Sequence, residues 1–272
     1  MGINDKKEKS EFSPSTSSIN FNLNRLLILG FVYIAAIGIA EYVCNYLSGV
    51  AGIVVYFIIL ILLIYNGTKE RNQNQRKLWF ALSLVPVIRI VGNATPLLPP
   101  FNIIVWYLVI SVPIVISIII ASRIIRFNIN DVGLNWNYSY VQIIIGIVGI
   151  GLGIVAYIIL KPEALTNQLS IQIIFFPVII LMLLGMLEEV IFRGVIQKAS
   201  AVIGSYDWIF VAVIYTTTQI GQRSILYGLF TFLVGLIFGW FVKKTRSVTG
   251  VGIAHGLINV CAYIILPHIF IR

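Results

Sequence analysis

Residues 170–193 read SIQIIFFPVIILMLLGMLEEVIFR, a nearly continuous apolar run that ends in two glutamates and an arginine. A helix needs roughly 20 apolar residues to cross the hydrocarbon core of a bilayer. On both sides of this stretch the chain continues as further apolar runs separated by short polar segments. Nine candidate runs result, at residues 25–47, 50–66, 77–93, 102–122, 138–160, 170–192, 207–220, 224–242 and 248–267.

The fold that these runs predict is all-α: a polytopic transmembrane helical bundle with about eight or nine membrane helices. Open strands are excluded, because lipid offers no partners for unpaired backbone groups. The number of membrane helices depends on two runs. Residues 77–93 contain Pro86 and Arg89, and residues 207–220 form a short run. Composition agrees, because 59% of the 272 residues are hydrophobic and only 11% are charged.

The net charge of +9 comes from lysines and arginines that gather in alternate polar segments. With the N-terminus inside, nearly all of them fall on the inner side, and only Lys161, Arg223 and Arg272 fall on the outer side. This asymmetry follows the positive-inside rule. It predicts an odd number of spans and a cytoplasmic N-terminus, and we expect the plasma membrane of a prokaryote. We expect no nucleic-acid partner, because the sequence has no Gly-rich phosphate loop or zinc-finger spacing.

A polar, partly amphipathic stretch at residues 123–137 divides the chain. Residues 1–24 begin polar and Ser-rich, which predicts a disordered cytoplasmic tail. Residues 25–122 are expected to form plain N-terminal membrane helices. Residues 138–272 are expected to form the membrane-embedded core that carries the chemistry.

Ionisable side chains are costly inside a membrane and usually have a function there. The densest cluster is Glu188, Glu189 and Arg193. Glu189 and Arg193 are four residues apart, so on a helix they can form an ion pair. Glu188 points about 100° away and is free for another role, such as a general base. Ordinary charges at the cytoplasmic end of a helix would produce the same local pattern.

A second cluster pairs His255 with Asn259 in the segment GIAHGLINV. They are also four apart and share one helix face. Together an imidazole and an amide can hold a water molecule or donate to a developing oxyanion. The small residues Gly252, Ala254 and Gly256 let a neighbouring helix approach closely, which fits a packing role as well.

EExxxR at residues 188–193 followed by HxxxN at residues 255–259 resembles the CAAX-processing and bacteriocin-processing protease family, also called Abi or CPBP. Each motif alone is a weak signal. The two in this order, each in an apolar helix, are fairly specific. The resemblance covers roughly residues 170–267.

The resemblance implies that Glu188 activates an attacking water, with Glu189 and Arg193 in support. It implies that His255 and Asn259 stabilise the oxyanion. The implied activity is that of an intramembrane endopeptidase, which hydrolyses a peptide bond in a membrane-associated or prenylated CAAX-type protein or peptide. Family members have been described both as metalloendopeptidases and as metal-independent glutamate proteases. The implied cofactor is thus a divalent metal such as zinc, held by Glu188 and His255, or none.

One position departs from the family pattern. A further family motif places a histidine four residues after an aromatic residue, and here the stretch from Tyr215 ends in Gln219. We include Gln219 among the candidate catalytic residues, because its amide can hydrogen-bond a water. It cannot act as a base, and amide is a poor metal ligand beside imidazole.

Two alternatives to an active protease follow. A catalytically inactive protein with the same fold would bind a membrane partner or peptide, as an immunity protein or an adaptor. A small transporter would use Glu41, Arg89 and Glu188 along a path. The transporter is disfavoured, because the sequence shows no duplicated half with matched broken helices.

Overall fold

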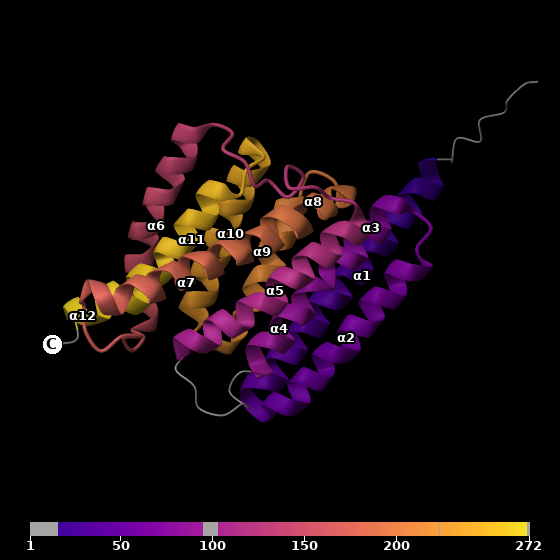
Figure 1. Ribbon diagram of the computed structural model, residues 1–272. Helices are drawn as coiled ribbons and strands as arrows, with labels where there is room; N and C mark the ends of the chain where they lie inside the picture. The colour runs from indigo at the N-terminus through magenta and orange to yellow at the C-terminus, as the bar shows by residue number, and fades with distance from the viewer. Residues whose placement is uncertain (1–15, 95–102, 223, 271–272) are drawn as a thin grey trace, which may run out of the picture.

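The computed structural model describes residues 16–94, 103–222 and 224–270, and these fold as a bundle of helices (Figure 1). The residues 1–15 of the expected tail lie outside the described residues, and the first helix begins at Thr16. The N-terminal helices are α1 (Thr16–Tyr42), the π-helical turn η1 (Val43–Leu47), α2 (Gly49–Lys69), α3 (Gln73–Leu82), α4 (Leu84–Ala94) and α5 (Ile103–Ile125).

The C-terminal helices follow a loop at residues 126–138. They are α6 (Ser139–Leu160), α7 (Ile171–Glu189), η3 (Val190–Ile196), α8 (Gln197–Ala199), η4 (Ser200–Ile203), α9 (Asp207–Thr217), η5 (Ile220–Gln222), α10 (Ile225–Thr245), α11 (Thr249–Val260), η6 (Cys261–Ile265) and α12 (Leu266–Phe270). Helix α11 packs against both α6 and α7, and α9 pairs with α10.

Eight helical segments among the described residues are long and apolar enough to cross a membrane, which confirms the expected all-α polytopic bundle. One expected run is corrected, because residues 207–220 contain only the 11-residue helix α9. At 1.5 Å per residue such a helix covers about half of a bilayer core. The eight spans are residues 25–47, 49–69, 73–94, 104–125, 139–160, 171–203, 225–245 and 249–270.

The third span is broken in the middle, where α3 ends at Leu82 and α4 begins at Leu84. Pro86 explains the break. Proline has no backbone N–H to donate to the preceding turn, so it fits most easily in the first turn of a helix. Pro86 is the third residue of α4. The Ser83 hydroxyl between the two helices donates to the carbonyl of Phe80 at 2.7 Å.

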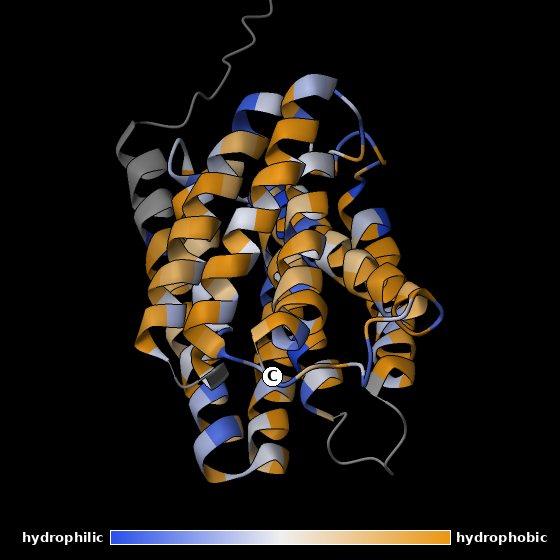
Figure 2. Cartoon of the chain, turned by 90° about the vertical axis from the view of Figure 1, so that its left-hand side faces the viewer, coloured by the Kyte–Doolittle hydropathy of each residue, from blue (hydrophilic) through white to orange (hydrophobic). Residues whose placement is uncertain are grey.

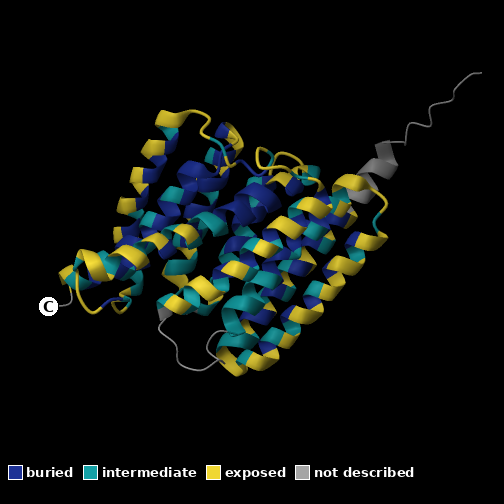
Figure 3. Ribbon diagram, viewed as in Figure 1, coloured by how far each residue is buried: buried dark blue, intermediate teal, exposed yellow. Residues whose placement is uncertain are grey.

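Large apolar side chains cover the outward faces of the bundle, as the orange helices of Figure 2 and the yellow outer ribbons of Figure 3 show. Exposed apolar surface of this extent marks contact with a membrane. The C-terminal span is the exception, because 72% of its most apolar window is buried inside the protein. Helix α11 is therefore the central helix, surrounded by protein.

The polar connections separate to the two ends of the bundle. At the upper end in Figure 1, Lys198 pairs with Asp131 at 3.4 Å and the Asn135 amide donates to the carbonyl of Arg246 at 2.9 Å. At the other end, Thr166 and His268 form a hydrogen bond of 3.1 Å. The start of α1 and the C-terminal α12 lie at opposite ends of the bundle (Figure 1). Which end faces the cytoplasm stays a prediction.

Candidate active site

The charged cluster forms where α7 changes into a π-helical turn. Glu188 and Glu189 are the last residues of α7, and Arg193 lies within η3. A π-turn is rare and occurs frequently at functional sites. Every residue of η3 is buried, so this turn carries Arg193 into the interior.

Glu189 is the centre of a buried hydrogen-bonded group. Its Oε1 atom lies 3.2 Å from Arg193 Nη1 and 2.7 Å from His255 Nδ1. The side chains of Glu189 and Arg193 are each only 1% exposed. This confirms the expected ion pair and adds His255 to it. An ionised carboxylate only accepts hydrogen bonds, so Nδ1 of His255 donates to Glu189 and Nε2 faces away from it.

Glu188 lies on the open side of the same group. Its side chain is 36% exposed, and its Oε2 atom is 3.8 Å from His255 Nε2. That distance is too long for a direct hydrogen bond, and it suits a water held between the two groups. The two adjacent glutamates therefore have different environments: Glu188 is partly exposed, whereas Glu189 is buried and bonded through Oε1, with its Oε2 atom left without a partner among the described residues.

Glycines allow α7 and α11, the two helices that carry Glu189 and His255, to approach each other closely. A Cβ atom on Gly185 of α7 would lie 2.4 Å from the backbone N of Gly256 on α11. On α11, a Cβ on Gly252 would lie 2.4 Å from the Met186 sulfur, and one on Gly256 would lie 2.6 Å from the Met182 sulfur. Small residues are what allow membrane helices to approach this closely. The contact places Glu189 beside His255.

Tyr215 of α9 closes the site from a third direction. The guanidinium carbon of Arg193 lies 4.5 Å from the centre of the Tyr215 ring, a cation–π contact. The same ring meets Phe192 edge-on at 5.1 Å and His255 edge-on at 6.2 Å. Arg193 Nε and Nη2 are buried with no hydrogen-bond partner within the described chain. The aromatic face therefore supplies part of the stabilisation of that charge.

A pocket with about 300 Å³ of empty space, part of it open to the surroundings, adjoins the cluster. His255 and Asn259 both line it, which confirms that they share one face of α11. The opposite wall of this pocket comes from α10 and was not predicted from the sequence, because its apolar, aromatic and hydroxyl side chains form no motif. The residues of that wall are Tyr227, Phe230, Thr231 and Val234.

Gln219 is not part of this group. It lies in the turn after α9 ends at Thr217, and its backbone N–H donates to the carbonyl of Thr216 at 2.9 Å. It does not line the pocket beside His255, and the hydrogen bonds recorded for the described residues do not join it to Glu188 or His255. The structure thus brings together Glu188, Glu189, Arg193, His255 and Asn259, and leaves Gln219 outside.

The donor set does not fit a catalytic zinc site. Such sites use three protein ligands, with a fourth position open to water. Glu188 and His255 offer two, and His255 Nδ1 is already engaged by Glu189. Within the ranges the structure describes, no three His, Cys, Asp or Glu side chains are grouped to hold a metal ion.

The N-terminal helices contain a separate buried group around Glu41. Arg89 Nη2 lies 2.8 Å from Glu41 Oε2, and Tyr56 and Asn45 donate to the same carboxylate. The pairing of Glu41 with Arg89 across the first and third spans is confirmed. The group is built from the N-terminal helices, whereas Glu188 is at the end of α7.

The fold and this cluster define a class of protein: a polytopic membrane protein with a Glu–His–Arg centre enclosed by its C-terminal helices. Residues 170–261 match the family model of type II CAAX prenyl endopeptidases, described as Rce1-like. The match runs from the start of α7 to the first residue of η6 and contains every residue of the cluster. It confirms the resemblance to the CAAX-processing family over this segment. No curated protein and no solved structure matches the chain.

Proposed function

We propose that this protein is an intramembrane endopeptidase that hydrolyses a peptide bond in a membrane-associated or prenylated, CAAX-type protein or peptide. The observation that carries the proposal is the position of Glu188. Its carboxylate is partly exposed and stands 3.8 Å from His255 Nε2, while Glu189 fixes the other nitrogen of the same ring. The family match over residues 170–261 supports the same reaction class.

In the proposed mechanism Glu188 is the general base. A water held between Glu188 and His255 loses a proton to the carboxylate as its oxygen attacks the carbonyl carbon of the substrate. The tetrahedral oxyanion accepts a hydrogen bond from the Asn259 amide, and from His255 Nε2 when the ring is doubly protonated. The protonated Glu188 then delivers its proton to the leaving amine nitrogen. No step requires a metal.

Glu189 and Arg193 are positioning residues in this mechanism. Glu189 holds His255 in one orientation through the 2.7 Å bond to Nδ1, and Arg193 fixes Glu189. An orienting carboxylate behind a catalytic ring is a recurrent arrangement in hydrolytic sites. The apolar and aromatic wall of the pocket from α10 suits a substrate that carries apolar groups next to the scissile bond.

Cleavage of a prenylated fluorogenic peptide by the purified full-length protein in detergent tests the proposal. We expect Glu188→Gln to lower kcat/KM by about 10² to 10⁴, the usual contribution of general acid–base catalysis. Glu163→Gln removes an exposed carboxylate from the connection between α6 and α7, and we expect wild-type rates from it. Full activity in Glu188→Gln would contradict the assigned role.

A catalytically inactive protein that binds a membrane peptide is the second candidate. The observation that favours it is the place of Gln219, outside the cluster, where the family pattern has a histidine. Suppose that the wild-type protein cleaves no peptide, that Gln219→His cleaves, and that adding Glu188→Gln to Gln219→His abolishes the cleavage. The natural protein would then be the inactive, peptide-binding member. Cleavage by wild type at a rate that Gln219→Ala leaves unchanged would instead show that residue 219 is dispensable.

A further inference from the structure

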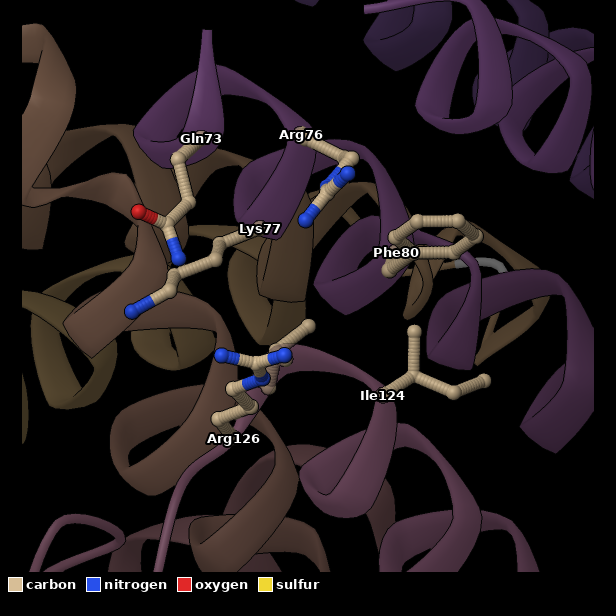
Figure 4. Close-up of a pocket in the computed structure, with 7 residues that line it drawn as sticks. Gln73, Arg76, Lys77, Phe80, Ile124 and Arg126 are labelled. Atoms are coloured by element: carbon tan, nitrogen blue, oxygen red, sulfur yellow. The ribbon is translucent and has the colours of Figure 1, made fainter. Parts of the chain in front are cut away.

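A second pocket lies between α3 and the end of α5, away from the candidate active site (Figure 4). It has about 220 Å³ of empty space and is open on one side. Neither its residues nor its location belongs to the cluster around Glu188. The lining side chains that matter are Gln73, Arg76, Lys77, Phe80, Ile124 and Arg126.

The pocket has a cationic part and an apolar part. The guanidinium groups of Arg76 and Arg126 approach it from opposite sides, with the Lys77 amine beside them (Figure 4). Phe80 and Ile124 form the other part. Two planar guanidinium groups and an ammonium suit a phosphate group, which arginine binds through paired N–H donors. The apolar part suits hydrocarbon attached to that phosphate.

The pocket carries an excess of positive charge. No carboxylate among the described residues lies within ion-pairing distance of Arg76, Lys77 or Arg126. Asp131, on the neighbouring loop, accepts the backbone N–H of Asn128 and is paired with Lys198; these contacts, and the more distant charge of Lys77, lower the pKa of its carboxyl. Lys77 is held in place by its contact with the Phe127 ring, 5.3 Å from Nζ to the ring centre.

Arg126 occupies a backbone position that does not favour arginine. Its φ is +59°, in the left-handed region that glycine adopts freely after a helix. A residue with a Cβ atom pays roughly 1 kcal/mol there. The Arg126 side chain is exposed and lines the pocket, so its guanidinium group is available to a ligand there.

The depth of the pocket matches the headgroup region of a bilayer. One of its walls is the beginning of the span at residues 73–94, and the other is the end of the span at residues 104–125. Both spans meet the membrane surface at this level. Basic pockets between transmembrane helices at this depth hold anionic lipid headgroups.

We propose that the pocket of Arg76, Lys77 and Arg126 binds the phosphate headgroup of an anionic phospholipid, with the lipid chain leaving past Phe80 and Ile124. The site is separate from the proposed peptidase centre and does not depend on it. Bound lipid would tie the end of α5 to α3, at the junction between the N-terminal helices and the core.

Native mass spectrometry of the full-length protein, titrated with phosphatidylglycerol or phosphatidylcholine, tests the proposal. We expect phosphatidylglycerol to bind more tightly, and we expect Arg76→Gln/Arg126→Gln to weaken it by about tenfold or more, given roughly 1 kcal/mol per basic residue at a lipid surface. The matched control is Arg71→Gln/Arg123→Gln, which removes two exposed arginines from the same end but not from the pocket. We expect a clearly smaller weakening from it, because neither side chain lines the pocket.

Three results would overturn the proposal: equal affinity for the two lipids, equal weakening by the two double variants, or displacement of the lipid by inorganic phosphate at the same concentration. The last would identify a site for a free anion. Gel filtration and circular dichroism establish that the variants are folded. If the double variant does not fold, Arg126→Gln alone is expected to weaken phosphatidylglycerol binding severalfold, and an unchanged affinity would count against the lipid site.

Discussion

At the scale of single residues, Glu188 and Glu189 are identical side chains at adjacent helical positions, and they lie in different environments. Glu189 turns inward, is 1% exposed, and is held by Arg193 and His255. Glu188 turns toward the open side and is 36% exposed. A buried charge has to be paired, whereas a partly exposed carboxylate can exchange a proton with a water. The proposed positioning role of Glu189 and the proposed base role of Glu188 rest on these environments.

The burial of Glu189 leads to a stability prediction. Glu189→Gln leaves Arg193 as an uncompensated buried charge, and breaking such a pair costs about 3–5 kcal/mol. We expect this loss in the free energy of unfolding, measured by denaturant titration of the protein in mixed micelles. The proteolytic activity is expected to fall with it, because His255 loses the acceptor at Nδ1.

Lys198→Met is the control for that experiment. It removes the ion pair with Asp131, in which the two side chains are 50% and 33% exposed. Exposed pairs of this kind contribute about 0–1 kcal/mol, so we expect a change within that range. Equal destabilisation by Glu189→Gln and Lys198→Met would contradict the view that the Glu189 group is a buried unit.

Much of the site could be predicted from the sequence, because the residues in question are charged or polar within apolar runs. The ion pair from Glu189 to Arg193 and the shared face of His255 and Asn259 follow from helical spacing. The bond from Glu189 to His255 joins α7 to α11, and single-sequence spacing carries no information on it. The position of Gln219 depends on where the preceding helix ends, and α9 ends at Thr217, two residues before it.

At the scale of the elements, α11 is positioned by glycines on the helices around it. A Cβ on Gly149 of α6 would lie 2.3 Å from the carbonyl oxygen of Ala254, the residue before His255. Gly185 of α7 approaches Gly256 on the other side of α11. These contacts hold His255 between two helices with little room for displacement, so the geometry of the site depends on backbone packing.

This packing predicts that alanine substitution of two glycines in α6 has different effects on stability. Gly149→Ala forces α6 and α11 apart, and overpacking of this kind costs about 1–3 kcal/mol. Gly151→Ala adds a methyl group with nothing within 4 Å, so we expect unchanged peptide cleavage and an unfolding free energy that is unchanged or raised by up to about 1 kcal/mol, since alanine favours a helix over glycine. The comparison uses thermal unfolding and the fluorogenic assay for both variants. A neutral Gly149→Ala would show that the α6–α11 contact is looser than described.

The helices themselves were largely predictable, because hydropathy over about 20 residues is a strong signal. The seventh run was predicted as a possible span and is instead an 11-residue helix. Its apolar character reflects burial against α10 and α1 inside the protein. Apolar sequence indicates burial in protein and burial in lipid equally well, and only length separates the two.

At the scale of the whole molecule, the basic connections gather at one end of the bundle, and the connection at residues 161–170 and the terminal helix α12 lie at the other. The sequence predicts that the basic end faces the cytoplasm. Contacts such as the ion pair of Lys198 with Asp131 join segments far apart in the chain at this end. The predicted direction of insertion rests on the charge asymmetry.

Labelling with a membrane-impermeant maleimide tests this orientation. In intact cells we expect Glu163→Cys, on the outer connection, to react, and Asn74→Cys, at the basic end, to react only after permeabilisation. Both positions are exposed. The wild-type protein is the control, because Cys261 is buried and Cys44 is half-buried. The reverse pattern would show that the protein is inserted with its basic end outward.

The most direct test of the central claim is the incorporation of oxygen from water into the cleaved product. The full-length protein is incubated with a prenylated CAAX peptide in H₂¹⁸O, and the new carboxylate is analysed by mass spectrometry. We predict one ¹⁸O atom per cleaved bond with wild type and with Glu163→Gln, and no product above background with Glu188→Gln. Labelled product at the wild-type rate from Glu188→Gln would contradict the claim that Glu188 activates the attacking water.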